Sequence, residues 1–183
     1  MNEKKILTNL ERLVYENKYA RLFDNNVTFP GDVKGRYLKF EWTAPYGVGV
    51  LPILSDGRIQ LVRSYRYASE QMSIEIPKGF GESQFPPVEM ARRELMEETG
   101  LEASTFTEIA CLRTEAGLMN HRLHIFRAVS CVQAASPSPE CSEVFAEPVI
   151  LPLEEAIALV MAGTIDDAVT IAALLLHRLA KTS

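Results

Sequence analysis

The sequence predicts an α/β (α+β) fold, in which a mixed β-sheet is sandwiched between α-helices and an antiparallel β section precedes it. Three observations predict this fold. Residues 37–42 alternate between apolar and polar side chains, as a half-buried strand does. Residues 48–54 and 59–63 are apolar runs joined by an Asp-Gly turn, which favours a β-hairpin. Helical signals occupy three later segments, at 87–99, 153–161 and 168–181.

Length and composition indicate one globular domain with a small appendage. The chain has 183 residues, 47% of them hydrophobic, and a net charge of −5 without a Lys/Arg run, which argues against a nucleic-acid-binding protein. Its three cysteines, Cys111, Cys131 and Cys141, lack metal-type spacing and are expected to be reduced and structural in a cytoplasmic protein. The polar N-terminus does not resemble a signal peptide, and no apolar run is long enough to span a membrane.

The first 45 residues are expected to form the N-terminal β section, and residues 46–183 the main domain. Short apolar patches at 10–15 and 21–23 precede a Pro-Gly turn at 29–32. A piece of this size cannot build a core of its own, so it must dock on the main domain or on a second subunit.

The helix at 87–99 has clear start and stop signals. Pro86 and Pro87 suit its first turn, where a backbone N–H has no partner, and Gly100 can adopt the left-handed conformation that ends a helix. An apolar stripe for the core is formed by Val88, Ala91 and Leu95.

Three glutamates, Glu94, Glu97 and Glu98, recur on this helix at i, i+3 and i+4 and are therefore neighbours on its surface. Like charges at this spacing repel each other, and a shared cation would turn the repulsion into attraction. Carboxylates, water and substrate phosphate are the ligands that Mg²⁺ and Mn²⁺ prefer. The alternative is an ordinary solvated glutamate-rich helix face.

The whole stretch from Gly79 to Leu101 resembles the Nudix box, G-x5-E-x7-R-E-U-x-E-E-x-G-U, where U is a bulky aliphatic residue. Phe85 departs from the pattern, since it stands where the family has a glutamate with a structural or outer-shell role. Glu82 could partly substitute for that glutamate. The matching positions are Gly79, Arg93, Glu94, Leu95, Glu97, Glu98, Gly100 and Leu101.

The resemblance covers roughly residues 45–183 and implies the Nudix fold and a divalent-metal-dependent hydrolase. It implies that Glu94, Glu97 and Glu98 hold the metal together with the backbone carbonyl of Lys78. Arg93 is expected to orient the box carboxylates through an ion pair.

The segment before the box, R-x-Y-R followed by E-x-P-x-G, is similar to that of ADP-ribose and other nucleoside-diphosphate-sugar hydrolases. The similarity implies that Arg66, with Arg63 near it, binds the diphosphate and that Glu75 lies near the substrate. The planar fork of arginine suits two phosphate oxygens at once. The alternative is that Arg63 and Arg66 are ordinary exposed charges at a strand end.

Beyond the box, strands are predicted at 109–112 and 121–129, with a loop at 114–120 between them. The loop lacks the proline of many ADP-ribose hydrolases, and its Glu115 is expected either to bind a substrate hydroxyl or a second metal, or to be a solvated charge. His121 and His124 are three residues apart on a strand and would lie on opposite faces. We therefore expect surface or half-buried histidines rather than a metal pair.

Residues 133–142 are rich in Ser, Pro and Ala, which predicts a mobile loop. Glu140 and Glu143 lie in or beside it, and related hydrolases use a loop carboxylate from this region as the general base. A base outside the box is reasonable, because metal-bound carboxylates are poor proton acceptors. Either glutamate could serve, and the alternative for each is a solvated loop acid.

The last third is expected to contain a strand ending at 148–152 and two helices without chemistry. The helix at 153–161 is stopped by Gly163, and Asp166 or Asp167 caps the helix at 168–181. The apolar positions predicted to mark the buried face of the second helix are Val169, Ala172, Leu176 and Leu179.

The leading hypothesis is Mg²⁺- or Mn²⁺-dependent hydrolysis of ADP-ribose or another ADP-sugar to AMP and a sugar phosphate. The resemblance to ADP-ribose pyrophosphatases also implies a homodimer formed through the N-terminal section, with no nucleic-acid or membrane partner. A second hypothesis is a hydrolase of a GDP-mannose-type sugar, a dinucleoside polyphosphate or NADH. A third is a non-catalytic nucleotide-sugar binding protein, which Phe85 favours and the otherwise intact box disfavours.

Overall fold

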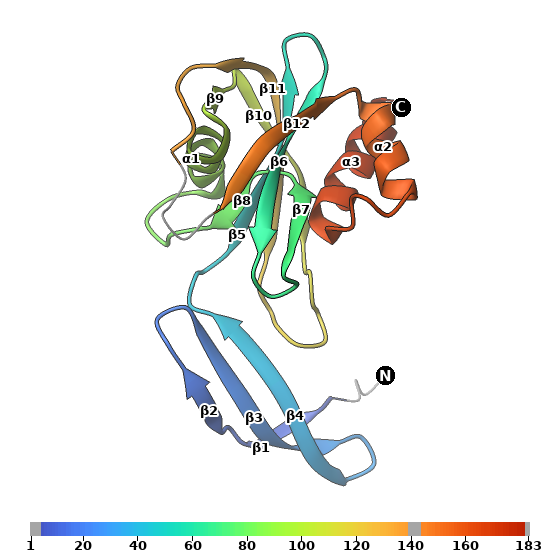
Figure 1. The fold of residues 1–183 in the computed structure, drawn as a ribbon. Coiled ribbons are helices and arrows are strands. Elements are labelled where there is room, and N and C mark those ends of the chain that lie inside the picture. Colours follow the sequence, from blue (N-terminus) through green and yellow to red (C-terminus); the bar gives the residue numbers. More distant parts are fainter. Residues whose placement is uncertain (1–4, 139–143, 182–183) are drawn as a thin grey trace. The chain divides into compact units, whose positions relative to one another are not determined.

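The computed structural model describes residues 5–138 and 144–181. They divide into two compact units, each with its own sheet (Figure 1). The first unit contains residues 1–45 together with 115–121, and the second contains residues 46–114 and 122–183. The predicted division at residue 45 remains a prediction, and the sequence did not indicate that 115–121 would join the N-terminal section.

The first unit is a four-stranded antiparallel sheet in which β3 pairs with each of the other strands. Its core is thin, because Ala20, Phe23 and Val27 of β3 are buried while β1 and β2 are exposed throughout. The predicted Pro-Gly turn joins β3 to β4. The strands are β1 (Leu7–Leu10), β2 (Leu13–Glu16), β3 (Ala20–Phe29) and β4 (Val33–Trp42).

The second unit contains a mixed sheet with the strand order β10-β11-β5-β6-β12. Strands β11 and β5 are parallel, whereas the other neighbours are antiparallel, so the predicted mixed sheet is confirmed. Three shorter strands pair with this path: β7 with β6, β8 with β5, and β9 with β11. The strands are β5 (Gly47–Leu54), β6 (Ile59–Arg66), β7 (Gln71–Glu75), β8 (Lys78–Phe80), β9 (Leu101–Glu102), β10 (Thr105–Leu112), β11 (Leu123–Gln133) and β12 (Phe145–Leu151).

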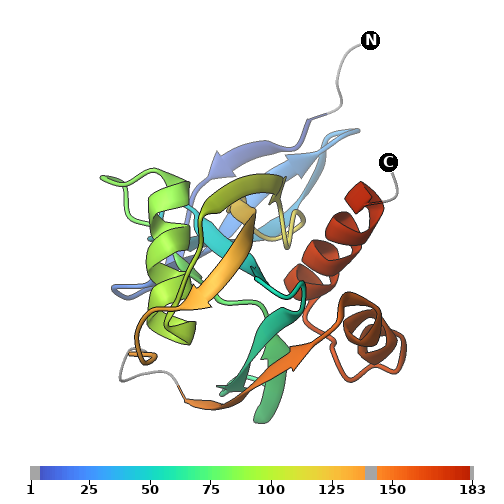
Figure 2. The ribbon, with the colours of Figure 1, turned by 90° about the horizontal axis from the view of Figure 1, so that it is seen from above.

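Helices cover both faces of this sheet, as Figure 2 shows. Helix α1 (Pro87–Thr99) packs on one face over the buried Val48, Val50 and Phe126, while α2 (Leu153–Met161) and α3 (Ala168–Lys181) enclose a second apolar cluster on the other face. The bounds predicted for all three helices are confirmed, and the sandwich fold with them. Within the described residues, no helix is long and apolar enough to cross a membrane.

Helix α1 follows its sequence signals closely. Pro86 is the N-cap, and Gly100 ends the helix in the left-handed region, with φ of 69°. Ala91 and Leu95 are fully buried, and Val88 packs at the margin of the same cluster, as the apolar stripe predicts.

The predicted buried face of α3 was partly wrong. Val169 is buried as expected, but Leu179 is 64% exposed, and the buried positions include Thr170 and His177. The hydroxyl of Thr170 accepts a hydrogen bond from the backbone N–H of Ile76 at 2.9 Å. A polar residue therefore faces the sheet, and the apolar pattern alone could not indicate that face.

Candidate active site

The glutamates at the end of α1 lie against the short strand β8. The carboxylate of Glu94 fills the space beside the Gly79 Cα, so that a Cβ at residue 79 would collide with it. The backbone N–H of Lys78 points to Oε1 of Glu98 at 3.4 Å, and Glu98 is only 6% exposed, whereas Glu97 is exposed. The carboxylates of Glu94 and Glu98 thus both lie against the backbone of residues 78 and 79. Because Gly79 has no side chain, it leaves room for the Glu94 carboxylate.

Next to this stretch, a charged network links β6, β7, β8 and α3. The guanidinium of Arg66 donates from Nε to Glu75 Oε1 at 2.9 Å and from Nη2 to Glu75 Oε2 at 2.5 Å. Lys78 Nζ lies 2.8 Å from Glu75 Oε2 and 2.5 Å from Asp167 Oδ1. Asp167 also accepts from the backbone N–H and the hydroxyl of Thr170, which confirms it as the cap of α3.

Glu75 is held as a carboxylate in spite of its burial. Burial alone raises its pKa, but the hydrogen bonds from Arg66 and the nearby Lys78 outweigh that effect and lower the pKa to about 2. The same hydrogen bonds raise the pKa of Arg66. Since the Arg66 side chain is 41% exposed and Glu75 only 3%, the arginine joins the buried carboxylate to the surface of the site.

Four carboxylates gather around the backbone of β8. Arg66 pairs with Glu75, Lys78 pairs with Glu75 and Asp167, and the carboxylates of Glu94 and Glu98 lie beside the backbone of residues 78 and 79. Carboxylate oxygens beside backbone carbonyl oxygens are a donor set that suits hard divalent ions. The residues present therefore fit the metal that the sequence predicts.

Arg93 is an exposed residue of α1 that contacts the loop before the helix. Its Nη1 is 3.6 Å from Glu82 Oε1, and its guanidinium stacks 3.8 Å above the ring of Phe85. Phe85 in turn packs on the apolar cluster beneath α1. Arg93 thus contacts Glu82 and Phe85, and the ion pair with the box carboxylates remains a prediction.

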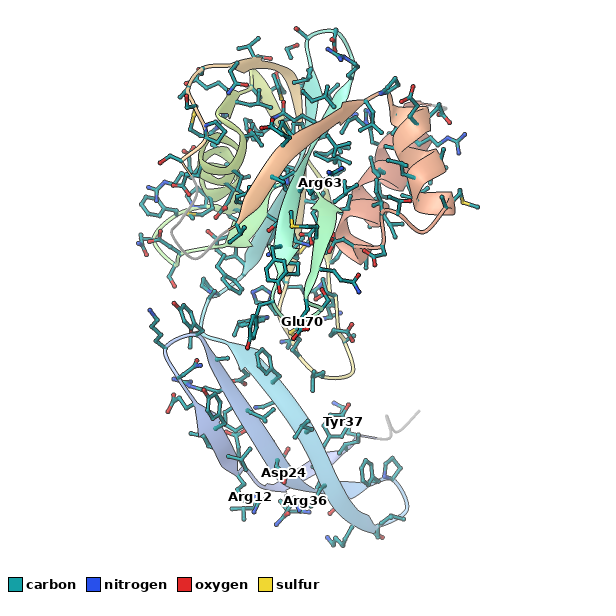
Figure 3. The ribbon with its side chains drawn as sticks, viewed as in Figure 1. Arg12, Asp24, Arg36, Tyr37, Arg63 and Glu70 are labelled. Carbon is teal, nitrogen blue, oxygen red and sulfur yellow. The ribbon has the colours of Figure 1, made fainter. Side chains whose placement is uncertain are left out.

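The structure does not bring Arg63 to this network, and it does not test Glu115. Residues three apart on a regular strand point to opposite faces, so Arg63 and Arg66 leave β6 on opposite sides (Figure 3 labels Arg63). Glu115 is exposed and belongs to the first unit, while the box lies in the second. Its role as a substrate ligand remains a prediction.

The loop after β11 is tied to the end of α1. Gln133 Nε2 donates to the carbonyl of Thr99 at 3.0 Å, and the backbone N–H of Ser138 donates to the carbonyl of Glu97 at 2.8 Å. Where the described chain resumes at residue 144, the carbonyl of Val144 accepts a hydrogen bond from the N–H of Tyr65 on β6 at 2.9 Å. Glu140 and Glu143, the two predicted bases, lie outside the described residues, but the chain on either side is anchored to α1 and β6.

A cavity of about 490 Å³ opens beside Glu98. Its walls come from β6, β12 and the end of the loop after β11, and they include Gln60, Val62, Pro137 and Phe145. Glu98 thus lines a cavity that also contains an aromatic ring and apolar side chains. This composition is typical of sites for small organic ligands.

Sequence reasoning missed part of this site. It treated Asp167 only as a cap, although its carboxylate also holds Lys78, and it gave Gln133 no role. No local motif marks either residue, because each acts through a partner distant in sequence. His121 and His124 are both half-buried, as expected, although His121 lies before β11 and not on the same strand as His124.

Comparisons with known proteins found a matching family profile and similar chains. A family profile described as "NUDIX domain" matches residues 43–174. The chain is 30% identical over 158 residues to an ADP-ribose pyrophosphatase of Bacillus subtilis (strain 168), covering 86% of this chain and 84% of the relative. It is 29% identical over 129 residues to a methanol dehydrogenase activator of Bacillus methanolicus, covering 70% of each.

The fold is also similar to a solved structure. A crystal structure of an ADP compounds hydrolase superposes with a TM-score of 0.85 at 23% identity, covering 96% of this chain and 93% of the other. At that identity the likeness concerns the fold, and it extends over both sheets described above.

Proposed function

The chain belongs to the Nudix family of pyrophosphohydrolases, and on that premise we propose that its substrate is ADP-ribose or another ADP-sugar. Water attacks a phosphorus of the diphosphate, and the products are AMP and a sugar phosphate. The observation that carries the proposal is the convergence of Glu94 and Glu98 on the backbone of β8, next to the Arg66–Glu75 pair. The name and the high coverage of the Bacillus subtilis relative support the choice of substrate class.

We propose that Glu94, Glu97, Glu98 and the backbone carbonyl of Lys78 hold the metal, with Mg²⁺ or Mn²⁺ as the ion. When bound, such an ion neutralises the diphosphate and helps to ionise the attacking water. Gly79 contributes by leaving space for the Glu94 carboxylate.

The remaining roles belong to side chains around the metal ligands. Arg66 binds a phosphate oxygen with the part of its guanidinium that faces solvent, while Glu75 fixes its orientation. Arg93 holds Glu82 and covers Phe85, and so keeps the loop before α1 in place. A carboxylate of the segment between Ser138 and Val144, Glu140 or Glu143, accepts the proton of the attacking water.

A direct test measures release of AMP and sugar phosphate from ADP-ribose with Mg²⁺ or Mn²⁺. Glu98→Gln should lower kcat by at least about a hundredfold, because metal-assisted charge stabilisation is worth several kcal/mol. Glu89→Gln is the matched control, since Glu89 is an exposed glutamate in the first turn of the same helix. Near-native activity of Glu98→Gln, in a variant with unchanged thermal stability, would refute the assigned role.

The same assay separates the competing substrates. A panel with a GDP-sugar, a dinucleoside polyphosphate and NADH beside ADP-ribose should give the highest kcat/KM for the ADP-sugar. A higher value for another member would keep the reaction but replace the substrate. Tight binding of ADP-ribose without product at any metal concentration would instead indicate a non-catalytic binding protein.

The general base can be assigned by comparing Glu140→Gln with Glu143→Gln. The base variant should lose at least about a hundredfold in kcat with little change in KM, since general base catalysis contributes that much. The other variant then serves as its control. Full activity in both variants would exclude this loop as the source of the base.

We also propose that the first unit forms a homodimer interface with a second copy of the chain. Its strands leave many apolar side chains exposed, which a monomer would have to keep in contact with water. Light scattering should give the mass of two chains, and Leu38→Asp should give one. The exposed apolar residues of this unit include Leu7, Leu10, Leu13, Tyr15, Val33 and Leu38.

A further inference from the structure

A second group of reactive side chains lies on strands β10 and β11, apart from the box. His124 Nδ1 is 2.9 Å from Glu108 Oε1, and its Nε2 is 3.8 Å from Cys111 Sγ. The imidazole therefore stands between a carboxylate and a thiol. We refer to Glu108, Cys111 and His124 as the thiol cluster.

An irregularity in the strand pairing brings the three side chains to one face. Cys111 is directly opposite His124, and Glu108 is directly opposite Phe126. Ile109 is an extra residue on β10, since the register shifts between Glu108 and Ala110. In a regular strand Glu108 and Cys111 would lie on opposite faces, and the bulge places both on the face of His124.

The ring of His124 is held in place from several sides. Tyr46 packs edge-on against it, with 5.7 Å between the ring centroids. The hydroxyl of Tyr46 donates to the carbonyl of Phe85 at 2.5 Å, so the tyrosine itself is fixed to the loop before α1. In the tautomer with a proton on Nδ1, that N–H donates to Glu108 and the lone pair of Nε2 faces the thiol.

We propose that Cys111 is a thiol modification site, activated by His124 and Glu108, that reacts with low-molecular-weight disulfides of the glutathione class. A nucleophile within reach of a base that a third group orients is the arrangement that activates serine and cysteine side chains. The cysteine is exposed, so a small disulfide can reach its sulfur.

The reaction is a thiol–disulfide exchange. His124 Nε2 accepts the proton of Cys111 Sγ, and the thiolate attacks one sulfur of the disulfide. A new S–S bond forms at Cys111 while the S–S bond of the reagent breaks. The leaving thiolate takes the proton back from the imidazolium, so Cys111 is oxidised to a mixed disulfide and one equivalent of the small thiol is released.

The same atoms could also be taken for metal ligands, since they lie within 4.8 Å of one another. Ligands of one ion must point to a common centre. Here the carboxylate points at the ring nitrogen, and the opposite ring nitrogen points at the sulfur. The geometry therefore favours proton transfer over metal binding, and the metal is an outcome that the test must exclude.

The second described cysteine provides an internal reference. Cys131 is 1% exposed, and its burial raises its pKa to about 11. The expectation that the cysteines are structural therefore fits Cys131, while the exposed Cys111 departs from it. Cys141 lies outside the described residues and is replaced by serine throughout the experiment.

The experiment follows the reaction of the full chain, carrying Cys141→Ser, with dithiodipyridine at one neutral pH. Cys111 should react at least about tenfold faster than the thiol of glutathione, since a positioned base contributes that much or more. Cys111→Ser should remove the fast phase, and His124→Asn should slow it to the rate of glutathione. Glu108→Gln should give an intermediate rate, and Glu102→Gln, an exposed glutamate on β9, should leave the rate unchanged.

Mass spectrometry after exposure to glutathione disulfide should then find the adduct on Cys111 and not on Cys131. Thermal unfolding verifies that each variant is folded, which we expect because Glu102, Glu108 and Cys111 are exposed and His124 is half-buried. Equal rates in the parent and His124→Asn would overturn the proposal. So would a stoichiometric divalent ion that protects Cys111 and disappears in Cys111→Ser, since the cluster would then be a metal site.

Discussion

Each unit of the chain contains a carboxylate held by two cationic side chains, and the two carboxylates differ in their access to water. In the first unit, Asp24 is 18% exposed and accepts hydrogen bonds from Arg12 at 2.6 Å and from Arg36 at 2.8 Å, whose side chains are more than half exposed (Figure 3). In the second unit, Glu75 is 3% exposed and is held by Arg66 and Lys78.

The difference shows how burial changes the function of the same chemical pair. An exposed ion pair contributes at most about 1 kcal/mol, because water and salt compete for both partners. A buried carboxylate that loses its partners, or buried cations that lose their carboxylate, cost several kcal/mol. We therefore regard Asp24 as a surface contact and Glu75 as the fixed charge that orients Arg66, the arginine that we propose binds phosphate.

The largest expected effect is on stability when Glu75 is neutralised. Glu75→Gln should lower the free energy of unfolding by about 3–5 kcal/mol, since it removes the carboxylate that Arg66 and Lys78 share. Urea unfolding at neutral pH measures the change. Glu70→Gln, an exposed glutamate before β7, is the matched control and should change the value by less than about 0.5 kcal/mol. A loss below 1 kcal/mol for Glu75→Gln would remove the contrast with Asp24.

Acid should reveal the same charge without a mutation. The pKa of Glu75 is lowered from 4.5 to about 2 in the folded chain. Its contribution, about 3 kcal/mol, is therefore fully present above pH 4.5 and is lost as the pH falls towards 2. The free energy of unfolding, followed over this range, should fall more steeply in the parent than in Glu75→Gln. Parallel curves would show that Glu75 is not held in this way.

A smaller effect is expected on activity when the guanidinium of Arg66 is replaced by an ammonium group. Arg66→Lys keeps the charge but loses the planar fork, and kcat/KM should fall about tenfold, the value of one hydrogen bond to a charged group. Arg63→Ala should stay within about twofold, because Arg63 leaves β6 on the other face. Equal losses in the two variants would contradict the assignment by face.

The smallest effect is expected for the ion pairs of Asp24 with Arg12 and Arg36. Asp24→Asn should lower the free energy of unfolding of the first unit by at most about 1 kcal/mol, and molar salt should reduce the difference towards zero. Urea unfolding at low and high salt, monitored by Trp42 fluorescence, measures both values. A salt-independent loss above 2 kcal/mol would place Asp24 in the same class as Glu75.

Local signals in the sequence were sufficient to predict where the helices begin and end. The bounds of α1 follow from Pro86, Pro87 and Gly100, because these residues restrict or release the backbone directly. The positions of Glu94 and Glu98 beside β8 agree with the motif that the sequence displays, and the glycine at residue 79 is the physical reason for the spacing.

Contacts between distant residues were harder to anticipate. The buried face of α3 was misjudged because the hydroxyl of Thr170 accepts a hydrogen bond from the backbone N–H of Ile76. The pattern of apolar residues within the helix gives no sign of this contact. Asp167 reaches Lys78 across 89 positions of sequence. The contact of Arg93 with Glu82 and Phe85 likewise joins a helix to the loop before it, which no local pattern indicated.

The extra residue at Ile109 has a consequence for reading related sequences. Glu108 and Cys111 are three positions apart and share a face only because Ile109 is bulged out of the strand pairing. Deleting the codon for Ile109 would leave the two residues two positions apart on a regular strand, where they would still share a face. A relative with a gap at this position could therefore keep the arrangement, whereas a relative with all the same letters would lack it if its strand paired without the bulge.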